Sequence, residues 1–427
     1  MDWSFLTKNK SELCVTTDSR RVVPGCVFVG LKGERFDGNL FVPQALEMGA
    51  AYAITDADQP MTCSQCQDYA DRIIRVDNSL LALQDLARAW RRELGLPILG
   101  ITGTNGKTTT KELCAAVLSR KYRLHYTQGN LNNQIGVPLT LLQITRAHEM
   151  AIVEMGASHP GDIRELVEIA EPNYGLITNV GRAHLQGFGS FEGVQRTKAE
   201  LYEWIIAHKG VIFRTADNPY LEQMYLTAKR SYSEAVFQQR DLSGEAGLLY
   251  HTGVMPDGTH LVGGYNAENV SAAICVGQYF GVSEEEALAA IRAYVPSNNR
   301  SQLMETERNT VVVDAYNANP TSMQAAIEAF SHQPSAIRPT CYILGAMREL
   351  GEYSHTEHQN IVNMLLERKA DKVLLVGEEY RETTAPYDIF DDVDALCTYL
   401  EAHPLSGYRI LLKGSRSNQL EKVIPFL

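Results

Sequence analysis

The sequence predicts an α/β protein built from three domains, and three observations lead to this fold class. The chain has 427 residues, and globular domains average roughly 150 residues. Short apolar runs alternate with helical stretches along most of the chain, which is the pattern of parallel sheets covered by helices. One apolar run ends in a glycine-rich turn, Gly103-Thr-Asn-Gly-Lys-Thr108, that leads into a helical stretch. We therefore expect a small α/β domain at residues 1–96, a central parallel-sheet domain with a phosphate loop (P-loop) at 97–296, and a Rossmann-like domain at 297–427.

Composition and charge exclude several classes of protein. Apolar residues make up 44% of the chain and charged residues 21%, which indicates a globular protein rather than a disordered one. Asp and Glu outnumber Lys and Arg by 51 to 39, and the net charge of −12 argues against nucleic acid or an anionic membrane as the main partner. The first ten residues lack the basic start and apolar core of a signal peptide. No apolar run reaches the roughly 18 residues that a membrane span needs, so we expect a cytoplasmic protein without membrane insertion.

The eight cysteines are scattered along the chain. The one close pair, Cys63 and Cys66, has the spacing of a redox or zinc motif, but no second pair and no histidine pair lies nearby to complete a zinc site. We expect reduced cysteines, as in cytosolic proteins.

The N-terminal domain alternates β-like runs with brief helical stretches. Strands are expected at residues 26–30, 52–54 and 72–76, and helices at 41–48 and 79–92. Gly95-Leu-Pro97 then forms the joint to the central domain.

The two following domains repeat the order strand, loop, helix. Central strands are expected at 98–102, 150–155, 175–180 and 211–214, with helices at 107–118, 162–170 and 198–206, and residues 238–264 are expected to add an antiparallel extension. C-terminal strands are expected at 310–315, 340–344, 372–376 and 409–412, with helices at 322–330 and 355–368. This repetition predicts a second doubly wound domain at the C-terminus.

The glycine-rich turn has the chemistry of a phosphate site. Glycines allow backbone N–H groups to turn toward phosphate oxygens, and the following helix N-terminus adds a positive dipole. Lys107 can reach the terminal phosphates and the Thr108 hydroxyl can bind Mg²⁺. The full Walker pattern is not met, because position 101, where that pattern requires its first glycine, is an isoleucine. We expect an ATPase-like central domain whose residues Gly103, Thr104, Asn105, Gly106, Lys107, Thr108 and Thr109 bind a nucleoside triphosphate.

Three further residues are expected at the same sheet edge. Glu154 ends a buried apolar run, where a carboxylate can complete Mg²⁺ coordination with Thr108. His184 follows another strand in a loop, where a histidine on its own is usually solvated. Lys198, within Thr197-Lys-Ala-Glu200, is expected near a helix N-terminus, a position that the helix dipole disfavours for a cation. These residues alone do not define a role for Lys198.

Together these residues resemble the Mur ligases, the ATP-dependent amide-forming enzymes that assemble the peptidoglycan stem peptide. The P-loop, Glu154, the His184 loop and the Lys198 segment all match, and the resemblance extends over nearly the whole chain. Asp18-Ser-Arg20 and Leu31-Lys-Gly-Glu-Arg-Phe-Asp-Gly38 resemble the uridine-nucleotide domain of the family. Asn130-Leu-Asn-Asn-Gln-Ile-Gly-Val-Pro138 resembles its substrate loop.

The most selective matches lie in the last domain. They are Asp314-Ala-Tyr-Asn-Ala-Asn-Pro-Thr-Ser-Met323, Leu344-Gly-Ala-Met-Arg-Glu-Leu-Gly351 and Lys413-Gly-Ser-Arg-Ser417. This set resembles the family members that add D-alanyl-D-alanine to UDP-N-acetylmuramoyl-tripeptide. Members that add the third residue usually carry His-Thr-Pro in place of the Asn-Pro stretch.

The resemblance implies roles for individual residues. Lys107, Glu154, His184 and Lys198 would be catalytic, and Lys198 would be carbamylated, so that two Mg²⁺ ions are held by Thr108 and Glu154 and by His184 and Lys198. Asn266 and Asn269 would lie near the adenine, and Arg300 and Asp314 near the ribose and phosphates of ATP. The residues that would bind the other substrates are Asp18, Ser19, Arg20, Arg35, Phe36, Asp37, Asn132, Asn133, Asn317, Asn319, Lys413, Ser415 and Arg416.

Two positions depart from the family pattern. Tyr265 stands where many relatives have a histidine before the asparagine, so the adenine contact is in doubt. Ala346 replaces an acidic residue, and we assign it no role.

The implied activity is a monomeric ATP-dependent ligase that works through an acyl phosphate, with the uridine nucleotide, ATP and the dipeptide each bound by one domain. One alternative is another ligase of the superfamily, of the folyl-polyglutamate or cyanophycin type, which Asp18-Ser-Arg20 and Arg35-Phe-Asp-Gly38 argue against. The other is a non-catalytic ATP-gated binding protein, which would need fewer metal ligands.

Overall fold

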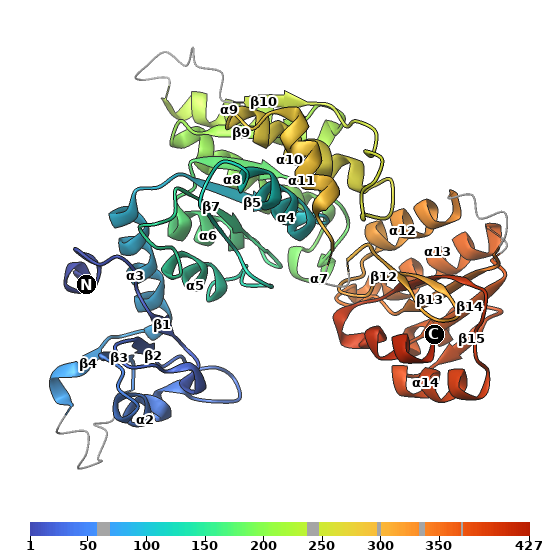
Figure 1. The fold of residues 1–427 in the computed structure, drawn as a ribbon, viewed down its shortest axis with the longest axis horizontal. Helices are drawn as coiled ribbons and strands as arrows, with labels where there is room; N and C mark the ends of the chain where they lie inside the picture. The colour runs from blue at the N-terminus through green and yellow to red at the C-terminus, as the bar shows by residue number, and fades with distance from the viewer. Residues whose placement is uncertain (58–68, 237–246, 297–299, 333–337, 369) are drawn as a thin grey trace.

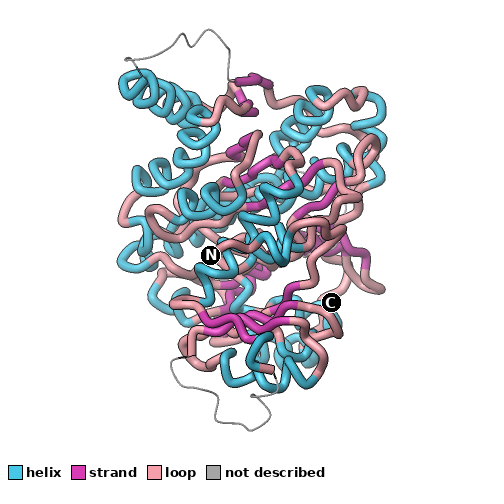
Figure 2. Tube along the Cα trace, turned by 90° about the vertical axis from the view of Figure 1, so that its left-hand side faces the viewer, coloured by secondary structure: helices cyan, strands magenta, loops and turns pink. Residues whose placement is uncertain are grey.

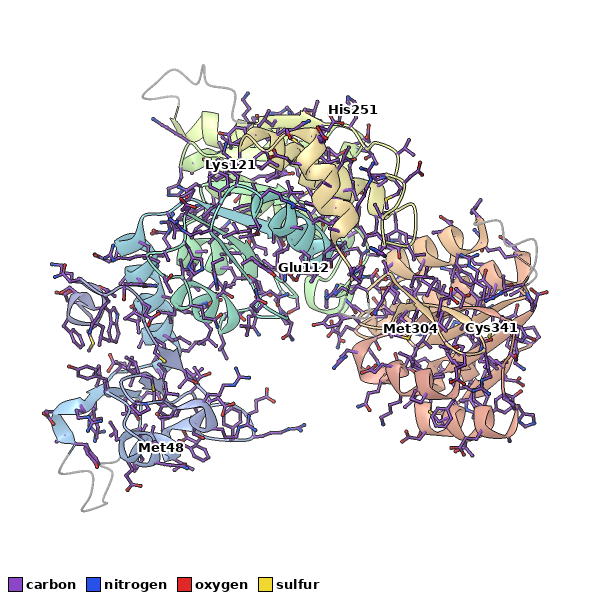
Figure 3. The ribbon with its side chains drawn as sticks, in the orientation of Figure 1. Met48, Glu112, Lys121, His251, Met304 and Cys341 are labelled. Carbon is purple, nitrogen blue, oxygen red and sulfur yellow. The ribbon has the colours of Figure 1, made fainter. Side chains whose placement is uncertain are left out.

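The computed structural model describes residues 1–57, 69–236, 247–296, 300–332, 338–368 and 370–427. Each predicted domain contains its own β-sheet, so the predicted α/β fold class is confirmed (Figure 1). The central domain links the other two, which lie at opposite ends of the long axis. In Figure 3, Met48 marks the N-terminal domain, Glu112 the central domain, and Cys341 the C-terminal domain. Cys63 and Cys66 lie outside the described residues.

The N-terminal sheet has four parallel strands in the order β1-β2-β3-β4. Their bounds are β1 Val15–Thr16, β2 Val27–Val29, β3 Tyr52–Thr55 and β4 Ile73–Arg75, with helices α1 Ser4–Thr7, α2 Val42–Glu47 and α3 Ser79–Leu94. Helix α3 begins at its N-cap Asn78, whose side chain accepts from the Leu81 N–H, and ends at Gly95 in the left-handed conformation. The predicted strands and helices of this domain are confirmed within a few residues.

The central sheet has six strands, all parallel, in the order β10-β9-β8-β5-β7-β6. The strands are β5 Ile98–Thr102, β6 Leu124–Tyr126, β7 Met150–Glu154, β8 Tyr174–Ile177, β9 Val211–Thr215 and β10 Gly247–Tyr250. The helices are α4 Lys107–Leu118, α5 Gly136–Leu142, α6 Asp162–Ala170, α7 Leu185–Phe188, α8 Phe191–Ala207, α9 Pro219–Val236, α10 Asn266–Tyr279 and α11 Glu284–Ala293. Strand β5 lies where the strand order reverses, which is where α/β sheets bind ligands.

The expected antiparallel extension at 238–264 is wrong. Strand β10 pairs parallel with β9, because the long helix α9 carries the chain back to the same end of the sheet before β10 begins. Residues 238–246 of that prediction lie outside the described part of the chain.

The C-terminal sheet also has six strands, in the order β11-β12-β16-β13-β14-β15. The strands are β11 Gln302–Glu305, β12 Thr310–Asp314, β13 Thr340–Gly345, β14 Lys372–Val376, β15 Asp388–Phe390 and β16 Arg409–Lys413, and the helices are α12 Pro320–His332, α13 Ser354–Glu367 and α14 Val393–Ala402. Strand β11, which the sequence reading missed, is antiparallel to β12 and makes the sheet mixed. The remaining described pairs are parallel.

Alternating side chains of each central strand enter two cores on opposite faces of the sheet. Leu99 and Ile101 of β5 pack with α4, α10 and α11, whereas Ile98 packs with α3, α5, α6 and α8. Figure 2 shows helices flanking the strands in this way. None of the described helices is both long and apolar enough to cross a lipid bilayer.

Helix α3 joins the N-terminal and central domains through one continuous core. Leu83, Leu86 and Trp90 belong to a cluster that contains strand residues of the first sheet as well as α5, α6 and α8. The Trp90 indole Nε1 donates to the carbonyl of Ile144 at 2.8 Å. Arg91, on the same helix, donates to the carbonyls of Ala170 and Glu171 and so caps the end of α6.

Replacing Trp90 by alanine therefore tests whether the two domains depend on each other. The substitution removes a fully buried indole and its hydrogen bond, and we expect the free energy of unfolding to fall by about 3–5 kcal/mol. Urea unfolding followed by circular dichroism measures the change. Leu81→Ala is the control, because Leu81 lies on the same helix with 57% of its surface exposed. An equal change in both variants would contradict the shared core.

Candidate functional site

A cavity of about 740 Å³ lies between the central and C-terminal domains. It is lined by residues that follow the carboxyl ends of β5, β7 and β8 in the central domain and of β12 in the C-terminal domain, and by Lys413, the last residue of β16. The predicted site residues on its wall are Thr104, Asn105, Gly106, Lys107, Thr108, Thr109, Asn132, Asn133, Glu154, His184, Asn266, Asn269, Arg300, Asp314, Asn317 and Lys413.

The P-loop needs its glycines for backbone conformation and for space. Gly103 and Gly106 have φ of 149° and 77°, which favour glycine. A Cβ on Gly103 would lie 1.9 Å from the Thr178 hydroxyl oxygen, and one on Gly106 would lie 2.5 Å from the Asn269 side-chain oxygen. The loop also binds the strand beside it, because Asn105 N–H donates to Asn179 Oδ1 at 3.0 Å. Helix α4 then begins at Lys107, directing its free N–H groups toward the cavity; Glu112 in Figure 3 lies farther along this helix.

Lys107 lies across the mouth of the loop. Its ammonium donates to the carbonyls of Gly103 at 2.7 Å and Thr104 at 3.1 Å. Burial lowers the pKa of Lys107 to about 8, and the Glu154 carboxylate opposes that shift. The Lys107 ammonium therefore faces the same cavity as the N–H groups of the loop. A phosphate group in the cavity could contact both.

Glu154 and Thr108 meet as predicted. The Thr108 hydroxyl donates to Glu154 Oε1 at 3.2 Å, and Asn132 Nδ2 donates to the same oxygen at 2.8 Å. Glu154 is 1% exposed, and its second oxygen, Oε2, is buried with no hydrogen-bond partner among the described residues. A buried carboxylate oxygen without a partner is costly, so this atom fits a cation ligand. No group of three His, Cys, Asp or Glu side chains suited to a metal occurs in the described part of the chain.

His184 makes a contact that the sequence did not predict. It has φ of 50°, and its Nδ1 is hydrogen-bonded to Glu349 of the C-terminal domain. Burial lowers the pKa of His184, while the Glu349 carboxylate opposes the shift. The contact orients the ring so that Nε2 is the nitrogen free of Glu349.

The expected position of Lys198 at a helix N-terminus is wrong. Helix α8 begins at Phe191 because Ser190 caps it, accepting a hydrogen bond from the Gly193 N–H, so Lys198 lies in the third turn. Lys198 is 2% exposed, and no described residue forms a hydrogen bond or ion pair with its ammonium. Burial, together with the charge of Lys107, lowers the pKa of Lys198 well below its ordinary value.

Asn266 and Asn269 lie behind the P-loop at the start of α10. Asn269 Nδ2 donates to Asn266 Oδ1 at 2.9 Å, and Asn266 Nδ2 donates to the carbonyl of Val262. Asn269 Oδ1 accepts from the Thr110 hydroxyl at 3.0 Å. Both side chains reach the cavity wall while fixing α10 against α4. Tyr265, the first of the two residues that depart from the family pattern, forms a hydrogen bond between its hydroxyl and Ser301 Oγ at 2.7 Å.

Arg300 and Asp314 come from the C-terminal side of the cavity. The Arg300 guanidinium stacks 3.9 Å from the centroid of the Tyr316 ring, and its Nε is buried without a partner among the described residues. Asp314 accepts a hydrogen bond from Lys413 Nζ at 2.6 Å, and Lys413 also donates to the carbonyl of Asn317. Ala346 is the second residue that departs from the family pattern. Its backbone carbonyl accepts a hydrogen bond from Ser415 Oγ.

A second cavity of about 370 Å³ adjoins the first, because His184 and Asn317 line both. The predicted residues Asn319, Ser415 and Arg416 lie on its wall. Asn319 also joins the two domains, since its Nδ2 donates to Asn105 Oδ1 of the P-loop at 2.8 Å.

The predicted residues of the N-terminal domain lie elsewhere. Asp18, Ser19 and Arg20 form a short 3₁₀ turn in which the Asp18 carboxylate accepts from the Arg20 backbone and guanidinium. Arg35 and Phe36 are exposed on a hairpin-like loop, and the following residue, Asp37, caps the next turn by accepting from the Asn39 N–H. None of the six predicted residues lines either cavity.

Sequence reasoning missed three residues of the site. Asn179 accepts a hydrogen bond from the P-loop, and Glu349 is hydrogen-bonded to His184. The Asp162 carboxylate accepts hydrogen bonds from the backbone N–H groups of Ser158 and His159. Glu349 lies inside the motif Leu344–Gly351 that the sequence analysis singled out, so its place in that motif was the available signal.

Three family models together match most of the chain. The Mur ligase family catalytic domain matches residues 14–91, the Mur ligase middle domain matches 101–277, and the Mur ligase glutamate ligase domain matches 299–416. A curated relative from Bacillus subtilis (strain 168) is 35% identical over 429 aligned positions, covering 97% of this chain and 92% of the relative. The chain belongs to the Mur ligase family.

Several relatives of this Mur ligase carry one name. The Bacillus subtilis protein is called UDP-N-acetylmuramoyl-tripeptide–D-alanyl-D-alanine ligase, and so is an Escherichia coli (strain K12) protein that is 31% identical over 97% of this chain and 93% of its own length. Among solved structures, MurF ligase from Thermotoga maritima in complex with ADP has a TM-score of 0.81 and 27% identity, covering 98% of each chain. A MurF structure from Acinetobacter baumannii has the same TM-score with 28% identity, covering 96% of this chain and 92% of that one.

Substitution of Gly106 tests whether the P-loop needs a glycine at this position. In Gly106→Ala, the new Cβ meets Asn269 at a positive φ, and we expect ATP to bind about 10-fold more weakly or worse. Isothermal calorimetry measures the affinity. Gly407→Ala is the matched control, because Gly407 has φ of 79° and nothing within 4 Å of an added Cβ. Equal affinities in the two variants would show that the close approach of Asn269 is unimportant.

Proposed function

We propose that this Mur ligase is an ATP-dependent enzyme that adds D-alanyl-D-alanine to a UDP-N-acetylmuramoyl-tripeptide during cytoplasmic synthesis of peptidoglycan precursors. The observation that carries the proposal is similarity over nearly the whole chain to relatives with that one name. The larger cavity supports the proposal, because its wall combines the P-loop, the buried carboxylate of Glu154 and residues of the C-terminal domain.

The chemistry explains why ATP is needed. A carboxylate does not condense with an amine in water, since hydroxide is a poor leaving group. The tripeptide carboxylate attacks the γ-phosphorus of ATP, which forms an acyl phosphate and releases ADP. The dipeptide amine then attacks the acyl carbon, phosphate leaves, and the nitrogen loses a proton.

The residues of the central domain stabilise charge in the first step. The loop N–H groups and the N-terminus of α4 bind the phosphates, and Lys107 exchanges its two carbonyl partners for phosphate oxygens. Thr108 and Glu154 would hold one Mg²⁺ through the carboxylate oxygen that has no partner, and His184 with a carbamylated Lys198 would hold a second. Magnesium ions supply neutralisation of the negative charge on the transferring phosphoryl group.

Burial favours the proposed modification of Lys198. A neutral amine, not an ammonium, reacts with carbon dioxide, and the low pKa of Lys198 leaves the amine neutral more of the time. The neutral amine forms an N–C bond with carbon dioxide, which gives a carbamate and releases one proton. Counted from the ammonium, which first loses a proton to become the amine, two protons leave and a buried cation becomes an anion. Burial, rather than the helix dipole, therefore makes an ammonium at Lys198 unfavourable.

The domain contacts suggest how substrates enter. The contacts between the central and C-terminal domains are largely polar, including Asn105 with Asn319, His184 with Glu349, and Arg182 with Glu357. Polar interfaces of this kind permit domain motion. We propose that residues 1–96 bind the uridine nucleotide, 97–296 bind ATP, and 297–427 bind the dipeptide and close over the ATP site in a monomer.

A phosphate-release assay tests the proposed function. We expect release only when ATP, Mg²⁺, a UDP-N-acetylmuramoyl-tripeptide and D-Ala-D-Ala are all present, and omission of Mg²⁺ should abolish it. Tripeptides with lysine or diaminopimelate as the third residue identify the preferred acceptor. Release with a folate and glutamate instead would favour another superfamily ligase, and ATP binding without release would favour a non-catalytic protein.

Carbamylation of Lys198 gives a separate prediction. With ¹³C-labelled carbon dioxide, we expect one carbamate carbonyl resonance in the NMR spectrum, lost in Lys198→Ala. Lys111 serves as an internal comparison, since it is equally buried but donates to the Thr127 carbonyl and pairs with Glu112. An active enzyme with Mg-ATP bound and Lys198 unmodified would rule the carbamate out.

A further inference from the structure

The second cavity has the position required of the dipeptide site. Because His184 and Asn317 line both cavities, a molecule in the smaller one can reach toward the phosphate end of the larger one. Under the proposed function, the amine of the dipeptide must reach an acyl phosphate formed there. The amine therefore lies at the His184 end of the smaller cavity, and the rest of the dipeptide extends away from it.

The wall of this cavity carries two arginines, of which Arg416 is paired with Glu421 at 3.2 Å. Arg348 follows β13 and Arg416 follows β16, so two separate loops each contribute a guanidinium to the wall. The one acidic residue on the described wall is Glu349, which is engaged with His184. Ser415 and Ser417 add hydroxyl groups between the arginines and are hydrogen-bonded to each other at 3.0 Å.

Arg348 is held in place while keeping free donors. Its Nε donates to Ser417 Oγ at 3.3 Å, and its Nη1 pairs with Glu379, which does not line the cavity. Arginine has five N–H donors, and among the described residues its Nη2 has no partner. A guanidinium already fixed by two contacts loses little side-chain entropy when it binds an anion.

D-Alanyl-D-alanine carries one anionic group, its C-terminal carboxylate. With the amine directed to His184, the carboxylate at the other end of the dipeptide can reach the wall that carries Arg348. Arginine recognises carboxylates through paired, charge-assisted hydrogen bonds. We propose that Arg348 binds the C-terminal carboxylate of the incoming dipeptide and makes the enzyme select a free acid. The sequence reading did not assign Arg348, and the inference rests on the proposed function.

The experiment compares two amine substrates that differ only at this group. Steady-state phosphate release is measured with D-Ala-D-Ala and with D-alanyl-D-alaninamide, which has no carboxylate. We expect wild-type enzyme to prefer the acid. In Arg348→Ala, the KM for the acid should rise about 10- to 100-fold, while the KM for the amide and for ATP stays unchanged. The preference for the acid is then lost.

Three variants separate this role from a structural one. Arg348→Gln keeps the length of the side chain without its charge and should lose the same preference, even if the alanine variant is less stable. Arg348→Lys should recover part of the preference. Arg381→Ala is the matched control, because Arg381 belongs to the same domain, pairs with Asp391 and does not line the cavity; it should behave as wild type.

Different failures lead to different conclusions. An active wild-type enzyme whose Arg348→Ala and Arg348→Gln variants keep the full preference for the acid would overturn the role of Arg348 alone. Equal KM increases for the acid and the amide would also overturn it, because a distorted cavity affects both. A wild-type enzyme with no dipeptide-dependent release would overturn the proposed function and this inference together.

Discussion

The site depends on one geometric constraint, which is that parallel strands present their carboxyl ends at a single edge of the sheet. The P-loop after β5, Glu154 at the end of β7 and Asn179 after β8 meet for this reason. In the C-terminal sheet, Asp314 and Lys413 likewise end the parallel strands β12 and β16 and line the same cavity. Because the two edges face one cavity, residues distant in the sequence line a single site.

The sequence predicts most of this arrangement where a signal is local. Apolar runs such as β5 and β14 were located to the residue, and the contact between Thr108 and Glu154 follows from strand ends alone. Other features depend on tertiary packing. The sequence reading began this helix at residue 198 and so missed the cap at Ser190, and nothing local to β10 distinguishes parallel from antiparallel pairing. The pairing of His184 with Glu349 joins two domains, so neither segment predicts it alone.

The two flanking domains are attached in different ways. The N-terminal domain shares a continuous apolar core with the central domain through Leu83, Leu86 and Trp90. The buried members of the apolar clusters in the C-terminal domain all belong to that domain among the described residues, although the partly buried Val262 of the central domain packs against one cluster. The other contacts between these two domains include an amide pair and ion pairs. Water competes for polar contacts far better than for buried apolar surface. We therefore expect the first attachment to persist and the second to permit the domain motion proposed above.

The shared core also constrains how the chain is made. Helix α3 ends at Leu94, yet the partners of Trp90 and Arg91 include Ile144 and Ala170, which are synthesised later. A domain that emerges first from the ribosome usually folds first. Here the part of α3 that packs against the central domain stays uncovered until the chain has extended past Ala170. Chaperone contact during synthesis should therefore concentrate on this helix, and a fragment that stops at residue 96 carries an incomplete core.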